Sequence, residues 1–424
     1  MKILVLGGGG REHAIVKSLR RSSASAEILC APGNAGIARD ARCLPISADT
    51  PEGIERLVAA ALKERPDLTV VGPEAPLVLG VAERLEAEGL RVFGPRSAAA
   101  RLEGSKCFAK EFLARHGIPT ADFRIFDEPR EARAYVERAA VPVVVKADGL
   151  AAGKGVFVAR DRADALRAVE AILVERRFGE AGRRIVVEEC LFGSEISFFA
   201  VLDGESFVVL ETAQDYKPLE DGDRGPNTGG MGSYSPYLAL EDPKAAAVLE
   251  QVVRPTARGL AKDGIAYRGV LYFGLMLTAS GPRVLEFNVR LGDPEAQALL
   301  PRLETSFVEL AERTLEGRLE GWRLSWDRRP SVTVVAASAG YPGRPETGAP
   351  ISGLDRGSDP EVLVFHSGTR LREDGAVVTA GGRVLAVTAL GEDRARAREK
   401  AYAALGRISF SGMRFRRDIG AEGR

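Results

Sequence analysis

The first hundred residues alternate between short apolar runs and stretches with helical spacing. The apolar runs predict buried strands, and residues 11–20 between the first two have the period of an amphipathic helix. Such alternation predicts a parallel α/β domain, in which ligands bind at the carboxyl ends of the strands. The four predicted strands are residues 3–6, 27–30, 69–71 and 91–93.

The first predicted strand runs into the glycine-rich sequence G-G-G-G-R-E-H, residues 7–13. This loop lacks the G-x-G-x-x-G spacing of a dinucleotide site, and no acidic residue ends the second strand to hold a ribose. The sequence therefore disfavours NAD or FAD. Backbone N–H groups at the start of the helix can still bind the phosphate of a smaller substrate.

Residues 97–117 have helical spacing and carry Lys106, and residues 141–159 predict two apolar strands joined by a glycine-rich loop. A hairpin of this kind can fold over a triphosphate, because glycines let backbone N–H groups approach phosphate oxygens closely. Lys146 on the incoming strand would then reach toward phosphate. A plain flexible turn is the commoner explanation of such a loop, and the pattern G-x-x-x-x-G-K-[ST] is absent here.

Residues 184–189 predict a strand that ends in carboxylates, and Glu195 follows Glu188 by seven residues. A strand leading into a short connection with a second acid could wrap an adenine and reach a ribose. Surface carboxylates at a strand end explain the same pattern nearly as well.

Residues 213–236 are the longest stretch without apolar periodicity. Long glycine-rich loops inside compact domains are often functional lids or disordered linkers. Proline near both ends and the dense Gly, Asp and Asn content favour an ordered loop that closes over substrates and excludes water. A linker is the alternative. Residues 242–263, which follow, predict a helix.

The segment 284–297 combines a buried strand with chemically useful polar residues. Glu286, Asn288 and Arg290 are spaced two apart, so their side chains project from one face of the strand. Mg²⁺ takes carboxylate and amide oxygens alongside phosphates and water, and a guanidinium clamps a phosphoryl oxygen with its planar fork. The turn 292–295 opens a helix whose free N–H groups point toward the strand end. This pattern indicates a phosphoryl-transfer site, and a solvated polar face on a half-buried strand is the alternative.

The chain becomes strand-rich again from residue 331 and then predicts a helix at 392–405, which is typical of a small α+β domain. A polar junction near 320–330 precedes it. We therefore expect three units, residues 1–100, 101–325 and 326–424, with a small lid at about 120–190 in the middle unit.

Composition narrows the function further. The 424 residues are 45% hydrophobic with a formal net charge of zero, so neither a nucleic-acid nor a membrane surface is expected. The first apolar run is too short for a signal peptide, no stretch is long enough for a membrane span, and the four cysteines are dispersed, which favours the cytoplasm. Only 11 of the 59 basic residues are lysines, so lysines inside motifs are informative: Lys106, Lys146, Lys154 and Lys217.

Taken together, these segments resemble the glycinamide ribonucleotide synthetases, the phosphoribosylamine-glycine ligases of the ATP-grasp superfamily. The resemblance covers nearly the whole chain, and R-x-G-D-P-E-x-Q at 290–297 is the family's own signature. The other motifs are V-L-G-G-G-G-R-E-H-A at 5–14, K-A-D-G-L-A-A-G-K-G at 146–155, D-G-D-R-G-P-N-T-G-G-M-G-S-Y-S-P at 221–236 and G-G-R-V-L-A-V-T at 381–388.

The resemblance implies a fold and a reaction. The fold is a Rossmann-like, pre-ATP-grasp N-terminal domain, an ATP-grasp region and a small C-terminal α+β domain. The reaction is the ATP-dependent joining of glycine to 5-phosphoribosylamine in de novo purine biosynthesis, through glycyl phosphate, with ADP and phosphate as the other products. The partners are these small molecules, and the protein is a monomer or a weak dimer.

The resemblance also implies roles for individual positions. Glu286 and Asn288 hold Mg²⁺ or Mn²⁺, and Arg290 and Asp215 serve the reacting groups. The residues implied for ATP are Lys106, Lys146, Gly149, Gly153, Lys154, Gly155, Glu188, Cys190 and Glu195. The residues implied for the other substrates are Gly10, Arg11, Glu12, Glu74, Gly229 and Gly230.

The chain departs from the family pattern at three positions. Leu291 replaces a Phe, whereas Tyr216 and Pro218 stand where the family has His and Arg, so no catalytic role is assigned to Tyr216. Two alternatives remain: another ATP-grasp ligase, which would lack the G-P-N-T-G-G-M-G and R-x-G-D-P-E strings, and a nucleotide-cofactor oxidoreductase or dinucleotide sensor built on the N-terminal loop.

Overall fold

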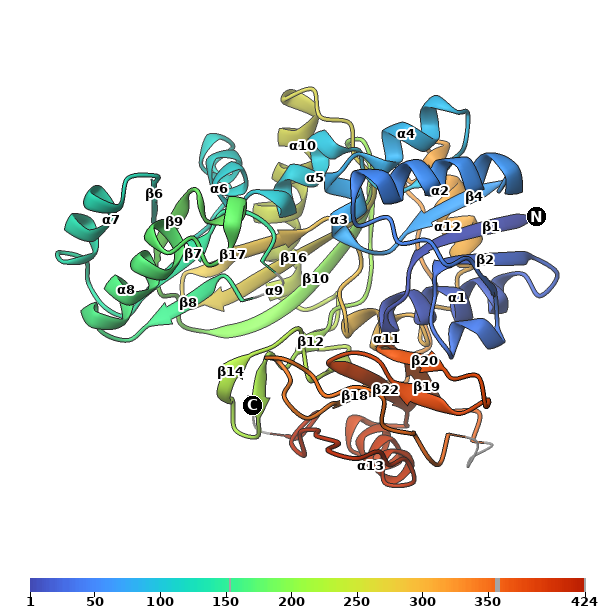
Figure 1. Ribbon diagram of the computed structural model, residues 1–424. Coiled ribbons are helices and arrows are strands. Elements are labelled where there is room, and N and C mark those ends of the chain that lie inside the picture. Colours follow the sequence, from blue (N-terminus) through green and yellow to red (C-terminus); the bar gives the residue numbers. More distant parts are fainter. Residues whose placement is uncertain (152–153, 355–358, 423–424) are drawn as a thin grey trace.

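The structure is a computed structural model that describes residues 1–151, 154–354 and 359–422. Gly153, one of the glycines expected to cover ATP, lies outside the described residues. The chain builds an N-terminal sheet, an outlying four-stranded sheet, a central sheet and a C-terminal sheet (Figure 1).

The N-terminal sheet is parallel, as the alternation of strand and helix predicts. Its strands follow the order β3-β2-β1-β4-β5, in which β1 is central and the chain winds outward in both directions. The strands are β1 (Lys2–Gly7), β2 (Glu27–Pro32), β3 (Arg42–Cys43), β4 (Leu68–Val71) and β5 (Val92–Phe93). The helices are α1 (Gly10–Ser22), η1 (Ile37–Arg39), α2 (Pro51–Glu64), α3 (Glu74–Val78) and α4 (Val81–Ala87).

The helix predicted over residues 97–117 is in fact two helices, α5 (Ser97–Gly104) and α6 (Lys106–Arg115). The prediction of one continuous helix is wrong because Ser105 adopts an extended conformation between them. Its hydroxyl accepts a hydrogen bond from Phe108 N at 3.1 Å and so caps α6. The break places Lys106 in the first turn of a new helix.

The outlying sheet has its own hydrophobic core, made of residues between Ala132 and Val187 (Figure 1, left). Its strand order is β6-β9-β7-β8, and the antiparallel β7–β8 pair confirms the predicted hairpin. The strands are β6 (Phe123–Phe126), β7 (Val143–Ala147), β8 (Val156–Ala159) and β9 (Ile185–Glu189). The helical segments are α7 (Pro129–Val136), α8 (Arg162–Val169), η2 (Glu170–Val174) and η3 (Gly179–Gly182).

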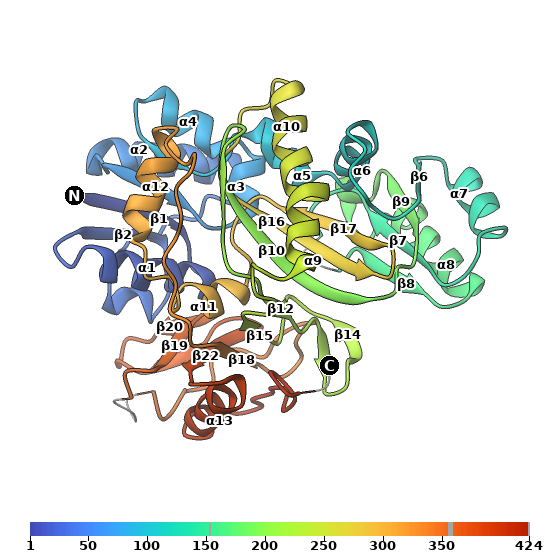
Figure 2. The same cartoon turned by 180° about the vertical axis from the view of Figure 1, so that it is seen from behind.

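The central sheet, β11-β10-β16-β17, is covered on both faces, so its two long strands are apolar on both sides. Phe198 packs into the core shared with α9 and α10, which lie over one face (Figure 2), whereas its neighbour Phe199 packs into the core shared with α12. The strands are β10 (Ser194–Asp203), β11 (Phe207–Val209), β16 (Arg268–Thr278) and β17 (Gly281–Asn288). The helical segments are α9 (Pro243–Val248), η4 (Leu249–Val253), α10 (Arg254–Lys262) and α12 (Phe307–Leu315).

Residues 213–236 are ordered, as expected, but they form short strands rather than the loop that their sequence predicts. They form β12 (Gln214–Asp215), β13 (Pro218–Glu220), β14 (Arg224–Asn227) and β15 (Gly232–Ser235). Strands of two to four residues are too short to show alternation, and β15 pairs with β18, about a hundred residues later in the chain. The sequence pattern therefore missed them.

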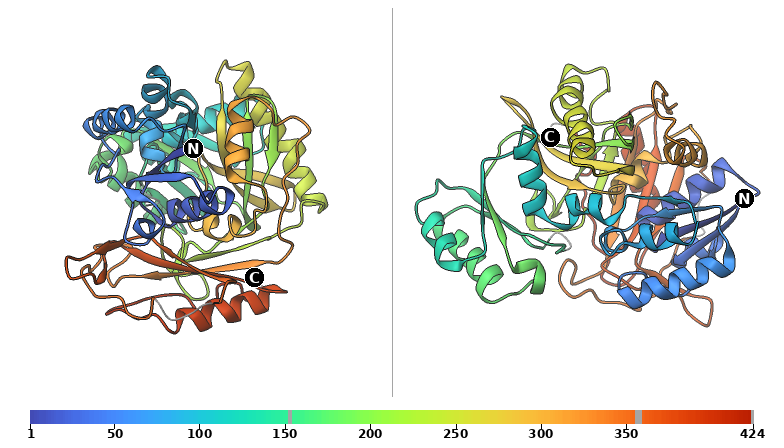
Figure 3. Two further views of the ribbon diagram at one scale, coloured as in Figure 1. Left: turned by 90° about the vertical axis from the view of Figure 1, so that its right-hand side faces the viewer. Right: turned by 90° about the horizontal axis from the view of Figure 1, so that it is seen from above.

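The C-terminal sheet, β12-β15-β18-β22-β19, recruits two of these strands and lies beneath the rest of the molecule in the left view of Figure 3. Helix α11 (Glu295–Leu299) packs between α1, β15 and β18 (Figure 1). The remaining elements are β18 (Ser331–Ala337), β19 (Val362–His366), β20 (Thr369–Leu371), β21 (Val377–Thr379), β22 (Arg383–Leu390) and α13 (Arg394–Leu405).

Two buried histidines join helix α1 to strand β19 of the C-terminal sheet. His366 N donates to His13 Nδ1 at 2.8 Å, and the two ring centroids lie 5.6 Å apart. Burial lowers the pKa of His13, and burial together with the neighbouring His13 lowers the pKa of His366 to about 3. Both rings are therefore neutral in the folded protein at neutral pH.

This junction predicts a specific pH dependence of stability. Below the ordinary histidine pKa of 6.5, His366 binds a proton in the unfolded chain but not in the folded protein. The free energy of unfolding therefore falls as pH decreases. The slope approaches about 1.4 kcal/mol per pH unit for this residue. In urea unfolding between pH 6.5 and 5, His366→Gln should show a shallower decline than the parent. Equal slopes for the two proteins would contradict the assignment.

Candidate active site

Glu286, Asn288 and Arg290 lie at the end of β17, where the N-terminal, central and C-terminal sheets come together. Glu286 pairs across the sheet with Gly274 of β16. A Cβ at position 274 would lie 3.0 Å from Glu286 Cγ, so glycine there leaves room for this carboxylate.

Lys217 neutralises the charge of Glu286. Its Nζ lies 3.6 Å from Glu286 Oε1 and 3.3 Å from Glu195 Oε2. Glu195 contributes most to raising the pKa of Lys217 well above its usual value, and Glu286 adds to the effect. Burial alone would raise the pKa of Glu286, but Lys217, Lys146 and Lys106 outweigh burial and lower it. Glu286 is therefore ionised.

Arg290 is held between two carboxylates. Its Nε donates to Glu74 Oε2 at 3.1 Å and its Nη2 to Glu103 Oε1 at 2.6 Å. Burial would raise the pKa of Glu74, but Arg290 and Arg11 outweigh it and lower that pKa to about 2. Burial raises the pKa of Glu103 to about 7 in spite of Arg290. The guanidinium is thus held by Glu74, at the start of α3 beside the N-terminal sheet, and by Glu103 of α5.

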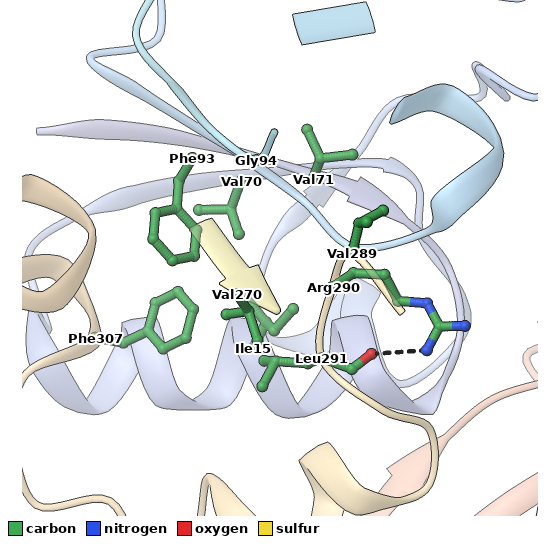
Figure 4. Close-up of a pocket in the computed structure, with 11 residues that line it drawn as sticks. Ile15, Val70, Val71, Phe93, Gly94, Val270, Val289, Arg290, Leu291 and Phe307 are labelled. Atoms are coloured by element: carbon green, nitrogen blue, oxygen red, sulfur yellow. Dashed lines mark hydrogen bonds between the residues drawn. The ribbon is translucent and has the colours of Figure 1, made fainter. Parts of the chain in front are cut away.

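The aliphatic part of Arg290 closes a small apolar cavity of about 10 Å³ (Figure 4). Phe93 of β5 and Phe307 of α12 line the far side, while the guanidinium points away and donates to Leu291 O at 3.2 Å. A volume of this size holds about one water molecule, and the lining is apolar. We therefore assign the cavity to packing between the sheets rather than to a ligand.

A second group of lysines surrounds Glu188 of β9. Lys146 and Lys110 both pair with Glu188, the latter at 2.5 Å. Burial would raise the pKa of Glu188, but the two lysines outweigh it and lower the pKa, while burial lowers the pKa of Lys110 to about 8. Lys146 Nζ also donates to Leu285 O of β17 at 3.1 Å. This ion cluster ties the outlying sheet to the strand that carries Glu286.

Lys106 connects α6 to the glycine-rich loop, because its Nζ donates to Gly149 O at 3.0 Å. Gly149 and Gly155 are both closely packed: a Cβ at Gly149 would lie 2.7 Å from Ala181 Cβ, and one at Gly155 would lie 2.8 Å from Ala151 Cβ. Burial lowers the pKa of Lys106. Lys154 is exposed on the same hairpin.

A small polar cavity of about 10 Å³ lies between β10, β12 and β16. Asp215 lines it, and within the part of the chain that the structure describes its Oδ1 is buried without a hydrogen-bond partner. Burial, together with the carboxylate of Glu295, raises the pKa of Asp215 well above its usual value. Glu295 accepts a hydrogen bond from Ser197 Oγ at 2.9 Å. Asp215 therefore brings an unpaired carboxyl oxygen to the lining of a water-sized space.

The first glycine loop is closed by its own side chains. Glu12 accepts from Gly9 N and from Arg11 Nε, both at 2.6 Å, and is buried. A Cβ at Gly10 would lie 2.5 Å from Gln297 Nε2. Arg11 Nη1 lies 3.8 Å from Glu74, so this loop reaches Arg290 through a shared carboxylate.

Gly229 and Gly230 lie against the turn that follows β17. Arg383 of β22 donates to the carbonyl oxygen of Gly229 and to that of Asp293, the latter at 2.7 Å, and pairs with Asp293 Oδ2 at 3.0 Å. Tyr341 Oη accepts from Gly229 N at 2.8 Å. The C-terminal sheet therefore holds this side of the site in place.

Cys190 and Tyr216 contribute little to the site through their side chains. Cys190 is half-buried, and its Sγ lies 4.0 Å from Leu191 O. Tyr216 is fully buried in the C-terminal core, where its hydroxyl accepts from Gly420 N at 3.0 Å and Arg416 lies 5.0 Å over its ring. The tyrosine at this departure from the family pattern therefore points away from Glu286.

The donor set fits a hard divalent cation. Glu286 is ionised, and Asn288 makes no side-chain hydrogen bond to residues 1–151, 154–354 or 359–422, which leaves its amide oxygen available. No group of three or more His, Cys, Asp or Glu side chains among those residues could enclose a metal. Mg²⁺ suits such a site, because it commonly takes one or two protein oxygens and completes its shell with phosphates and water.

The structure groups most of the predicted residues around the end of β17, and adds others. The sequence alone indicates no role for five of the added residues, which are Lys110, Glu103, Asp293, Glu295 and Arg383. It marks Lys217 only as one of few lysines. Scarcity of lysine was the available signal for Lys110 and Lys217, and Asp293 and Glu295 stood inside the signature turn. Glu103 had no local signal, and Arg383 stood inside the 381–388 motif without a role, since each reaches its partner across ninety residues or more.

Comparison with known proteins gives matches over the whole length. Residues 1–103, 104–296 and 331–422 match the N domain, the ATP-grasp (A) domain and the C domain of phosphoribosylglycinamide synthetase. A phosphoribosylamine–glycine ligase from Caldanaerobacter subterraneus subsp. tengcongensis is 48% identical over 99% of this chain and 100% of its own length. Another from Allochromatium vinosum is 51% identical over 99% of this chain and 98% of its own.

Solved structures agree. The phosphoribosylamine–glycine ligase of Thermotoga maritima superposes with a TM-score of 0.86 at 37% identity, covering 99% of this chain and 100% of that one. The biotin carboxylase domain of Hydrogenobacter thermophilus 2-oxoglutarate carboxylase, solved with MgADP and bicarbonate, gives a TM-score of 0.75 at 17% identity over 98% and 91% of the two chains. That second likeness concerns the fold alone, and together these findings confirm the predicted three-part ATP-grasp architecture.

The close packing at Gly230 gives a testable prediction. Gly230 has φ +107°, and a Cβ there would overlap the rigid ring of Pro294 and lie 2.7 Å from Asp215 Oδ1. Gly222 also has positive φ, +68°, but a Cβ there meets nothing within 4 Å. Gly222→Ala should cost about 1–2 kcal/mol of unfolding free energy from backbone strain. Gly230→Ala should cost about 1–3 kcal/mol more from overpacking.

Urea unfolding of the two variants and the parent measures this difference directly. Equal losses of unfolding free energy for Gly230→Ala and Gly222→Ala would show that the 230 turn is not packed against Pro294 as described.

Proposed function

The chain belongs to the phosphoribosylglycinamide synthetase family, and we propose that it joins glycine to 5-phosphoribosylamine at the expense of ATP. The observation that carries this proposal is the end of β17, where Glu286, Asn288 and Arg290 meet lysines from α6, β7 and the segment after β12. A site with cations from three elements and an ionised carboxylate is suited to phosphoryl transfer, in which the protein positions charge rather than forming covalent bonds.

The proposed reaction has two steps. A carboxylate oxygen of glycine attacks the γ-phosphorus of ATP, the bond to the β-phosphate oxygen breaks, and ADP leaves with glycyl phosphate formed. The amine of phosphoribosylamine then attacks the acyl carbon, loses a proton, and displaces inorganic phosphate. No protein nucleophile takes part, which agrees with a site made of ion pairs and backbone donors.

Each group of residues has a defined task in this proposal. Lys106 and Lys146 neutralise phosphate oxygens, and the loop from Gly149 to Gly155 covers them. The segment of Glu188 and Cys190 meets the adenine through its backbone, and Glu195 meets the ribose. Arg290 holds the transferring phosphoryl group or the glycine carboxylate.

Glu286 and Asn288 would hold a divalent cation, whose charge would offset the negative charge that develops on the phosphate oxygens. We propose Mg²⁺, with Mn²⁺ as a substitute. Glu286 stays ionised for this purpose because Lys217 and the neighbouring lysines lower its pKa.

The acceptor side is assigned to the loops facing Arg290. Asp215, Gly229 and Gly230 lie beside the turn after β17, where they would enclose the reacting groups and keep water from the acyl phosphate. Gly10, Arg11, Glu12 and Glu74 would bind phosphoribosylamine. Both oxygens of Glu12 already accept hydrogen bonds. Its role is therefore to shape the glycine loop, whose backbone N–H groups would face the substrate.

We also propose the setting of the enzyme. The functional units are residues 1–100, 101–325 and 326–424, with residues 120–190 as a lid and with β12 and β15 joining the C-terminal sheet. The protein works in the cytoplasm as a monomer or a weak dimer. None of the helices in the described ranges is long and apolar enough to cross a membrane.

ADP release from Mg-ATP tests the proposed function. It should require glycine and freshly generated phosphoribosylamine together, and omission of either should abolish turnover. Turnover that ignores both substrates, or that follows another carboxylate and amine, would disprove the named reaction.

Two substitutions test the assignment of the strand end. Arg290→Ala and Glu286→Gln should each lower kcat by on the order of a hundredfold, because a group that stabilises charge in the transition state contributes about 3 kcal/mol. Arg84→Ala is the control, since Arg84 is exposed on α4 and its one ion pair within the described part of the chain is with the exposed Glu55. An Arg290→Ala enzyme with the kcat of the parent would remove Arg290 from the reaction.

A further inference from the structure

Glu103 makes two contacts at the active-site end of β17 and belongs to neither the metal site nor the lid. It lies in the last turn of α5 and is 9% exposed. Its Oε1 accepts from Arg290 Nη2 at 2.6 Å, and its Oε2 accepts from Val289 N at 2.8 Å. One carboxylate thus fixes both the backbone at the end of the strand and the side chain of the next residue.

The other carboxylate on Arg290 is placed differently. The side chain of Glu74 is 30% exposed, against 8% for Glu103, and it is shared with Arg11. Glu74 bonds Nε at 3.1 Å, whereas Glu103 bonds Nη2 at 2.6 Å. The buried and shorter contact is therefore the one suited to stay in place when ligands enter, and the exposed one is suited to exchange.

We infer that Glu103 is a positioning residue for Arg290, holding its guanidinium and the end of β17 in the geometry needed for phosphoryl transfer. The inference rests on the proposed function and deepens it, because it names a residue that touches none of the reacting groups and acts chiefly through Arg290. An arginine side chain loses about 2 kcal/mol of rotamer entropy when it is fixed. A buried partner fixes it before substrate binds, so that less ordering remains for the reaction itself.

The chemistry of the clamp requires a carboxylate. Both donors, Val289 N–H and Arg290 Nη2–H, need an acceptor, and only an ionised Glu offers two. Burial raises the pKa of Glu103 to about 7, whereas the charge of Arg290 and the hydrogen bond from Val289 N favour the ionised form that the clamp uses. Gln has the same shape but one acceptor and one NH₂ group, so it would place N–H against N–H at one of the two contacts. It would also leave the buried guanidinium with one counter-charge fewer. Glu103→Gln therefore breaks the clamp with little change in volume.

A double-mutant cycle on kcat tests this inference. Glu103→Gln should lower kcat by about 10- to 100-fold, the scale expected when a catalytic group is displaced by up to 1 Å, while KM for ATP stays within about threefold. In an Arg290→Ala background the same change should lower kcat by much less than in the parent, because the residue through which it chiefly acts is gone. Glu111→Gln is the control, since Glu111 is exposed on α6.

Urea unfolding checks that every variant is folded. If Glu103→Gln does not fold, Glu103→Asp replaces it, because the Asp side chain is one methylene too short to reach both donors. Additive losses in the double variant, or a normal kcat with lowered stability, would overturn the inference alone. Parent activity that does not need glycine and phosphoribosylamine would overturn the proposed function and this inference with it.

Discussion

The ion pairs of Arg290 are the constraint on which the rest of the site depends. This guanidinium follows directly on the strand of the central sheet and pairs with Glu74 from the N-terminal sheet side and Glu103 from α5. A buried charge is tolerated only when it is paired and hydrogen-bonded, so the three elements must come together for any of them to fold well. The same contacts place Arg290 beside Glu286 and Asn288, where phosphate would lie.

Packing extends this constraint through most of the molecule. One hydrophobic core contains Val5 of the N-terminal sheet, Phe199 of the central sheet and Phe365 of the C-terminal sheet, with α12 between the first two. The outlying sheet instead has a separate core and projects to one side in the right view of Figure 3. Its contacts with the site include the Lys146–Glu188–Lys110 cluster and the bond from Lys106 to Gly149 O. A separate core is consistent with the lid proposed for this part of the chain.

Sequence patterns predicted the elements that depend on residues close together in the chain. The strand that carries Glu286 and Asn288, the β7–β8 hairpin and the parallel N-terminal sheet all follow from apolar spacing. The break at Ser105 and the short strands of 213–236 did not, because a cap and a pairing with β18 depend on distant or single residues. Glu103, Lys217 and Arg383 illustrate the same limit, since their partners are defined only by the fold.

The central claim is that the carboxylate of glycine attacks the γ-phosphate of ATP at the end of β17. The most direct measurement is the fate of ¹⁸O supplied in both oxygens of the glycine carboxylate, read by mass spectrometry of the released inorganic phosphate. The account predicts one ¹⁸O atom in the phosphate for each turnover with phosphoribosylamine present, because that oxygen bridges carbon and phosphorus in glycyl phosphate. Phosphate that carries no label in an actively turning-over enzyme would contradict it.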